Sequence, residues 1–214
     1  MNNASDDHDS EKGRIPVSHA RKPSRIANPG PAGCFGFAST AFLLSLYNLN
    51  ARGVHTPNVV VGMGVFAGGL VQLLAGMWEF PQGNLFGATV FSSFGAFWTS
   101  YATIFIPGPG ILNAYQDQTE LSNAIGLYLI VWFMVTVMFT IPVILRNLAF
   151  TVLLSTLAIA FLLLAIAEFT GMPSLAKAGG AFGIVTAVSA FYVGISGLLA
   201  AEETAFMRLP LGVR

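Results

Sequence analysis

Residues Leu148–Phe169 read LAFTVLLSTLAIAFLLLAIAEF, and Glu168 is the only charged side chain among them. A helix of about 20 mostly apolar residues is long enough to span the hydrocarbon core of a bilayer. The same pattern recurs along the chain, and six segments are expected to be transmembrane helices: Ala32–Leu49, Val59–Trp78, Leu85–Ile106, Asn123–Leu145, Leu148–Phe169 and Lys177–Ala200. The sequence therefore predicts an all-α integral membrane protein with six transmembrane helices.

The distribution of charge supports this fold class. Charged residues make up 9% of the 214 residues, whereas soluble domains carry about 25%. Nine of the charges fall in the first 27 positions, which leaves 11 for the remaining 187 residues. We expect residues 1–27 to form a disordered cytoplasmic tail, residues 28–200 the transmembrane domain, and residues 201–214 a short cytoplasmic C-terminal tail.

The positions of the basic residues predict the orientation. With both termini in the cytoplasm, eight Lys and Arg residues lie on the inner side, and only Arg52 and Lys177 lie outside. Membrane proteins concentrate basic residues in their cytoplasmic loops. Both termini are therefore expected in the cytoplasm, with the plasma membrane as the expected location. Pro142 is expected to kink the fourth segment.

A faint internal repeat relates the two halves of the chain. Leu73-Leu74-Ala75 precedes Glu79-Phe80, and Leu163-Leu164-Ala165 precedes Glu168-Phe169. Two halves of three helices each have opposite orientations, an arrangement that many transporters use to place a site near the membrane midplane. Chance similarity between apolar segments is the alternative explanation of this repeat.

Glycines at intervals of four residues predict close helix packing. Gly64, Gly68 and Gly76 lie on one face of the second segment together with Gln72, and Gly179 and Gly183 repeat the spacing in the sixth. Small residues at this spacing let two helix backbones approach each other. The pattern fits packing within one chain, and less well a contact between copies of the chain.

Few residues could carry chemistry. No Asp, Arg or His lies inside a span, Lys177 stands only at the first position of the sixth, and Glu79 and Glu168 stand at helix ends as the candidates for a proton-linked role. Ion pumps place charges at mid-membrane, so that class is excluded. With one cysteine, Cys34, and no catalytic motif, we expect no enzyme, no metal site and no cofactor. Zero net charge and the lack of a basic stripe after the tail argue against a nucleic-acid partner.

Two polar features are candidates for substrate contact. Asn28-Pro29-Gly30-Pro31 precedes the first helix, whose N-terminus could attract an anion, although such a sequence also simply begins a helix. In the third segment four hydroxyl residues share one face and could border a wetted pathway: Thr89, Ser92, Ser93 and Ser100.

Several motifs together resemble a known family. Asn28-Pro29-Gly30-Pro31-Ala32-Gly33 is similar to the Asn-Pro-Ala-Pro-Leu-Gly signature of the acetate uptake transporters, and Gly36-Phe37 follows it. The second-segment stretch 66–80 and the third-segment stretch 83–98 resemble that family as well. The resemblance covers about residues 28 to 200 and favours the eukaryotic, especially the fungal, branch. Its members are described as acetate or succinate proton symporters.

The resemblance implies a six-helix protomer with its own pore, assembled as a hexamer in the lipid bilayer. It places an apolar constriction at Phe37, Phe94 and Leu157, where Phe94 replaces the usual tyrosine. Five residues are the candidates for substrate binding: Asn28, Thr40, Gln72, Ser93 and Ala190.

The expected function is therefore channel-like transport of short-chain carboxylic acids, with acetate as the expected substrate and a proton crossing with it. One alternative is a channel for small neutral solutes or for ammonia and ammonium, because hydroxyl-lined pores suit these molecules as well. A second alternative, from another functional class, is a membrane scaffold or sensor that transports nothing and recruits partners through its tail.

Overall fold

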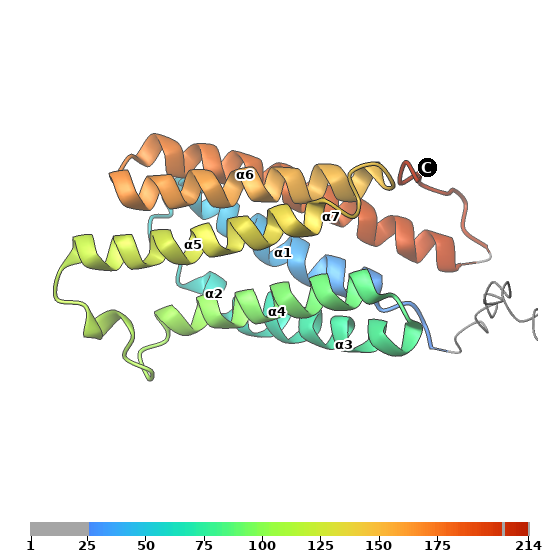
Figure 1. Ribbon diagram of the computed structural model, residues 1–214, viewed down its shortest axis with the longest axis horizontal. Coiled ribbons are helices and arrows are strands. Elements are labelled where there is room, and N and C mark those ends of the chain that lie inside the picture. The colour runs from blue at the N-terminus through green and yellow to red at the C-terminus, as the bar shows by residue number, and fades with distance from the viewer. Residues whose placement is uncertain (1–25, 203, 214) are drawn as a thin grey trace, which may run out of the picture.

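The computed structural model describes residues 26–202 and 204–213, and its helices run back and forth along one axis (Figure 1). The first helix is α1 (Gly30–Asn48), and the next rod joins α2 (Val59–Val65), the π-helix η2 (Phe66–Val71) and α3 (Gln72–Gln82). Four long helices follow: α4 (Leu85–Phe105), α5 (Gln118–Thr140), α6 (Leu148–Thr170) and α7 (Pro173–Ala201). The short turns η1 (Ala51–Gly53) and η3 (Leu112–Ala114) lie in the connections. The described part of the N-terminal segment lies at the same end of the bundle as the C-terminal segment (Figure 1). We call this end the terminal end.

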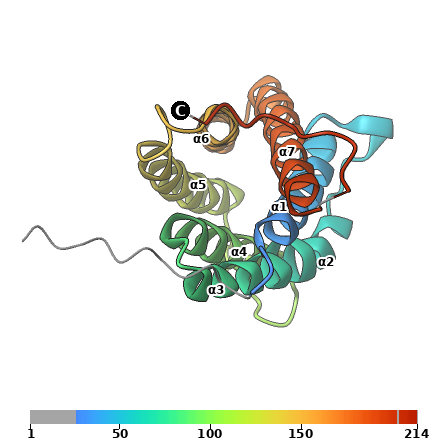
Figure 2. The same cartoon turned by 90° about the vertical axis from the view of Figure 1, so that its right-hand side faces the viewer.

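Four helical rods are long and apolar enough to cross a membrane: Val59–Gln82, Gln118–Thr140, Leu148–Thr170 and Pro173–Ala201. The other two, α1 and α4, are rich in glycine, serine and threonine, and about half of their residues are buried. In contrast, α5 fully buries only Gly126, Leu129 and Thr136; one side of it packs against the core, and its other side carries exposed apolar residues. Figure 2 shows the rods nearly end-on, with α1 beside α7. The structure is thus mostly helical, with small and polar residues concentrated in its interior helices.

The fourth of the expected segments begins and ends earlier than the sequence predicts. The prediction gave Asn123–Leu145, whereas α5 covers Gln118–Thr140. Asp117 caps the helix by accepting a hydrogen bond from the Thr119 N–H at 2.9 Å. At the other end, Ile141 still has helical backbone angles, but Pro142 has no N–H to continue the helical hydrogen bonds, and the helix ends at Thr140. Pro142 therefore follows the helix and does not kink it, which corrects the prediction.

The glycine face of the second rod packs inside the chain, as predicted. A Cβ atom added at Gly68 would lie 2.7 Å from Cγ of Trp98, and one at Gly76 would lie 2.5 Å from the Ser92 amide nitrogen. A Cβ at Gly64 would lie 3.1 Å from that of Ala102. All three neighbours belong to α4, so these glycines bring the two rods into close contact. The reading of this face as packing within one chain is confirmed.

The interior between the rods is filled by aromatic side chains. Phe97 of α4 is 3% exposed, and its ring centroid lies 5.0 Å from that of Trp132 and 5.1 Å from that of Phe161. These partners come from α5 and α6, so one residue of α4 connects three helices. Edge-to-face contacts of this kind stabilise a core beyond their burial alone.

Candidate functional site

Three cavities follow one another along the inside of the bundle. The Glu168 cavity, at the end away from the termini, has a volume of about 100 Å³. The central cavity measures about 20 Å³, and the Glu79 vestibule at the terminal end measures about 310 Å³. Phe37 lines both the Glu168 cavity and the central cavity. The central cavity and the vestibule share three lining residues, Cys34, Phe91 and Phe150. The hollows therefore form a line, and the middle one holds about one water molecule.

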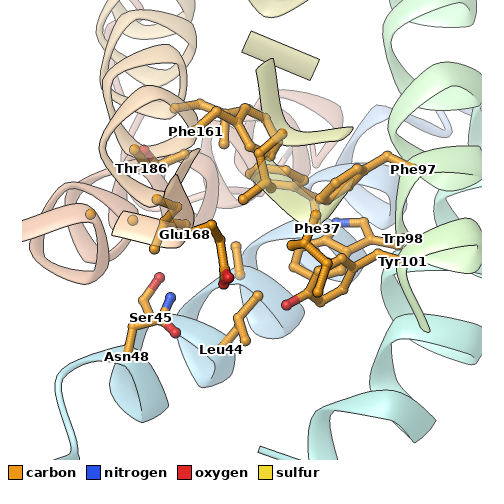
Figure 3. Close-up of a pocket in the computed structure, with 18 residues that line it drawn as sticks. Phe37, Leu44, Ser45, Asn48, Phe97, Trp98, Tyr101, Phe161, Glu168 and Thr186 are labelled. Atoms are coloured by element: carbon orange, nitrogen blue, oxygen red, sulfur yellow. The ribbon is translucent and has the colours of Figure 1, made fainter. Parts of the chain in front are cut away.

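The Glu168 cavity combines an aromatic wall with a polar rim. In Figure 3 the Glu168 carboxyl group points into the cavity, with Asn48 and Ser45 on one side and Tyr101 on the other. Trp98 also lines it, and its indole Nε1 is a buried donor without a hydrogen-bond partner among the described residues. A group entering from this end meets oxygen and amide atoms first and the aromatic wall afterwards.

The central cavity is almost entirely apolar. Phe94 is 2% exposed, and its ring lies 5.7 Å from that of Phe37 and 5.9 Å from that of Phe139, centroid to centroid. Gln72, which is 1% exposed, is the one amide side chain among the lining residues. Its Oε1 atom is buried and has no hydrogen-bond partner within the described residues. A buried acceptor without a partner costs about 1–3 kcal/mol, so Gln72 is an expensive residue to keep here for structure alone.

The Glu79 vestibule is built from helix ends. Glu79 is 3% exposed and accepts a hydrogen bond from Asn84 Nδ2 at 2.9 Å. The Oδ1 atom of Asn84 meanwhile accepts from the Gly87 N–H at 3.1 Å and so caps α4. One asparagine therefore begins the helix and holds the carboxyl group in place.

The start of α1 makes the other side of the vestibule. Asn28 Oδ1 accepts from the Gly30 N–H at 2.9 Å, and the Gly33 N–H donates to the Pro29 carbonyl at 3.2 Å. Pro31 has no N–H to offer. Much of the set of N–H groups that was expected to attract an anion is thus already hydrogen-bonded to residues at the start of the helix.

Most of the predicted site residues border these cavities. Phe37 and Leu157 line the Glu168 cavity, Phe94, Gln72 and Ala190 line the central cavity, and Asn28 lines the vestibule. The two predicted carboxyl groups, Glu79 and Glu168, lie at opposite ends of the line.

Two predicted binding residues lie elsewhere. Thr40 and Ser93 line none of the three cavities. The Thr40 hydroxyl donates to the Gly36 carbonyl at 2.9 Å and to that of Met63 at 3.4 Å, which ties α1 to the second rod.

The hydroxyl face of α4 lies away from the cavities as well. Thr89 donates to the Leu85 carbonyl of its own helix, and Ser100 donates to that of Phe97 and shares a hydrogen bond with the Tyr128 hydroxyl of α5.

Sequence reasoning missed most of the lining residues, among them Trp98, Asn84 and Leu211. Trp98 and Asn84 belong to stretches that were compared only as family motifs. The available signals were the indole N–H of Trp98, which needs a partner when buried, and the amide of Asn84, which can cap a helix. Leu211 lines the vestibule from the C-terminal segment. Nothing local in the sequence indicates that this segment folds back onto the bundle.

Comparison with known proteins finds relatives over most of the chain. A family model described as the GPR1/FUN34/yaaH family matches residues 12–212. Ammonia transport outward protein 2 of Saccharomyces cerevisiae is 43% identical over 190 residues, which are 88% of this chain and 67% of that protein. Acetate permease A of Emericella nidulans is 38% identical over 194 residues, which are 86% of this chain and 65% of that protein. The chain spans about two thirds of the length of these curated relatives.

A solved structure shares the fold. The structure of the bacterial acetate channel SatP matches with a TM-score of 0.78 at 30% sequence identity, and the match covers 88% of this chain and 100% of that one. Together with the apolar helices, these relatives identify an integral membrane protein whose relatives are named as acetate transporters, an acetate channel and ammonia transport proteins.

Proposed function

The chain belongs to the GPR1/FUN34/yaaH family, and on that premise we propose that it is a channel-like transporter through which short-chain carboxylic acids, acetate above all, cross together with a proton. The observation that carries the proposal is the central cavity. Phe37 and Phe94 enclose it, and its amide residue, Gln72, has an unpaired acceptor. The passage is narrow, and it is apolar except at Gln72.

The proton follows from the cost of moving charge through such a passage. An ionised carboxylate loses its hydration on entering the central cavity, and no positively charged side chain lines that cavity to replace it. An isolated carboxylate in apolar surroundings takes up a proton instead. The neutral acid carries an O–H group, which can donate to Gln72 Oε1, whereas the anion has only acceptors and would be repelled there.

Glu79 and Glu168 complete the mechanism as candidates for proton exchange at the two mouths. One borders the vestibule and the other borders the Glu168 cavity, so a permeating acid meets a carboxyl group before and after the apolar passage. Both groups are outside the central cavity, and no titration inside it is required. The apparent symport is then the passage of an intact acid molecule.

The test is acetate counterflow in proteoliposomes that contain the purified protein. At fixed total acetate, uptake of labelled acetate should rise as the external pH falls and should follow the concentration of the neutral acid, with and without an uncoupler. Empty liposomes measure the passive leak of the acid. A rate that follows the anion concentration contradicts the coupling to a proton, and a rate equal to the leak contradicts transport itself.

Ammonia is the second candidate substrate, because the same acceptor favours it. Ammonia and ammonium are hydrogen-bond donors, so either can satisfy Gln72 Oε1. A relative that is 43% identical is named an ammonia transport outward protein. Inhibition of acetate counterflow by ammonium, compared with formate and lactate, distinguishes the two substrates. A scaffold or sensor, the remaining alternative, would produce no counterflow with either.

The assembly and placement belong to the same proposal. We expect α1 and α4 to cross the bilayer with the four more apolar rods, which gives six transmembrane helices in two halves of opposite orientation. Both termini are expected in the cytoplasm, the protein in the plasma membrane, and the protomers in a hexamer. The positions of Glu79 and Glu168 at opposite ends of the line of cavities support the two inverted halves.

A further inference from the structure

The C-terminal segment Leu209–Val213, here called the strap, is held along its whole backbone. Four successive carbonyl groups accept hydrogen bonds. Ser196 Oγ donates to Leu209 at 2.8 Å, and Tyr192 OH donates to Pro210 at 2.7 Å. The Ala149 N–H donates to Leu211 at 3.1 Å, and the Leu148 N–H donates to Gly212 at 3.2 Å.

These donors belong to two different helices. Tyr192 and Ser196 lie near the end of α7, whereas Leu148 and Ala149 are the first residues of α6, whose N–H groups have no partner within their own helix. Figure 2 shows the C-terminal trace passing from the end of α7 across to the beginning of α6. The strap therefore connects two helix ends and supplies the acceptors that the start of α6 lacks.

The backbone at Gly212 fits only a glycine. Its φ is +64°, and a Cβ atom there would lie 2.7 Å from the Cβ atom of Leu148. A residue with a side chain would be strained in this conformation and would push the strap away from α6. The strap can therefore lie this close to Leu148 only with a glycine at position 212.

Docking places one apolar side chain in the wall of the pathway. Leu211 packs against the hydrophobic core and lines the Glu79 vestibule, which Asn28 and Asn84 also line. It also lines a second hollow of about 400 Å³ together with Val152, Val188 and its strap neighbours Pro210 and Gly212. The strap is accordingly the partition between the vestibule and this second hollow.

We propose that Leu211 is a pathway-lining residue of the vestibule, positioned there by the strap, so that release of the strap opens the side of the vestibule between α6 and α7. The transport part of this inference rests on the proposed function. The docking part does not, because the accessibility of the strap can be measured on a protein that transports nothing.

The first experiment attaches a charged group at Leu211. Single-cysteine variants Leu211→Cys and Val213→Cys are made in a Cys34→Ala background, whose own acetate counterflow is the reference. Both are treated with a charged methanethiosulfonate reagent, and the extent of labelling is read by mass spectrometry. Val213 lies on the same strap and is 71% exposed, but it lines none of these cavities.

Labelling of Leu211→Cys should abolish most of the counterflow, and equally complete labelling of Val213→Cys should leave it unchanged. Counterflow that survives full labelling at Leu211 overturns its place in the pathway. If the parent protein, with Cys34 in place, carries no acetate, the proposed function has failed, and the labelling rates still test the docking.

The second experiment loosens the strap. Tyr192→Phe with Ser196→Ala removes the two side-chain donors, and this should raise the labelling rate of Leu211→Cys about tenfold to a hundredfold. Ser189→Ala is the matched control, because Ser189 lies on α7 beside the strap but donates to the Val185 carbonyl of its own helix. An unchanged labelling rate in the double variant, or an equal rise in the control, contradicts the proposal that the strap positions Leu211.

Discussion

Gln72 is the residue at which stability and proposed function oppose each other. Its oxygen is buried without a partner among the described residues, and its side chain lines the smallest cavity of the pathway. Replacing Gln72 with methionine, which has a similar shape and no amide, should stabilise the protein by about 1–3 kcal/mol, because the penalty of the unpaired acceptor disappears. The same change should reduce acetate counterflow several-fold, because the permeating acid loses its acceptor. Thermal unfolding in detergent and counterflow in proteoliposomes measure the two effects.

Gln82 provides the matched control for this substitution. It lies on the same rod, but its Nε2 donates to the carbonyls of Ile26 and Ala27. Gln82→Met should therefore lower the unfolding temperature and should leave counterflow near the parent value. A Gln72→Met protein that is destabilised, or that transports as fast as the parent, contradicts a functional reason for the unpaired oxygen.

At the scale of single residues, the family resemblance identified more of the cavity-lining residues than the pattern of polar residues did. Phe37, Phe94 and Leu157 came from motif positions and border the line of cavities. Ser93 was chosen because hydroxyls repeat along one face of α4, and that face lies away from the cavities. Periodicity shows which residues share a face, but the direction of the face depends on contacts with other helices.

In the second rod, a π-helix keeps on one face the glycines that a regular α-helix would spread around its axis. Residues four apart in an α-helix of 3.6 residues per turn drift by about 40° at each step, so Gly64 and Gly76 would lie about 120° apart. The π-helix η2 lies between them, and its i to i+5 hydrogen bonds give more residues per turn, which opposes the drift. All three glycines therefore face α4. The spacing predicted the shared face, but nothing in the sequence predicted the π-helix that maintains it.

This packing makes a prediction at the scale of the helix pair. Gly76→Ala should destabilise the protein by about 1–3 kcal/mol, because the added Cβ atom would meet the backbone of Ser92, which cannot move without shifting α4. Gly62→Ala, on the same rod, should have little effect, since no atom lies within 4 Å of the added carbon. The midpoints of thermal unfolding in detergent compare the two variants. Because alanine favours a helix more than glycine does, a loss as large in Gly62→Ala as in Gly76→Ala would contradict the contact with α4 as the cause of the cost.

The whole molecule holds a complete line of cavities within one chain. The Glu168 cavity, the central cavity and the vestibule are each lined by several helices of a single chain. If the protomers assemble into the proposed hexamer, each should therefore conduct independently of its neighbours. On that expectation, transport by one protomer would not depend on the assembly.

Mixed oligomers test that independence. Ala190 is 1% exposed and lines the central cavity, so Ala190→Leu should fill the passage and abolish counterflow in a uniform oligomer. When differently tagged parent and Ala190→Leu chains are coexpressed and the mixed oligomers are purified, counterflow per oligomer should fall in proportion to the fraction of variant chains. Size-exclusion chromatography checks that the variant assembles normally. A decline much steeper than proportional would show that one blocked protomer silences its neighbours, and the passage would then have to be shared between chains.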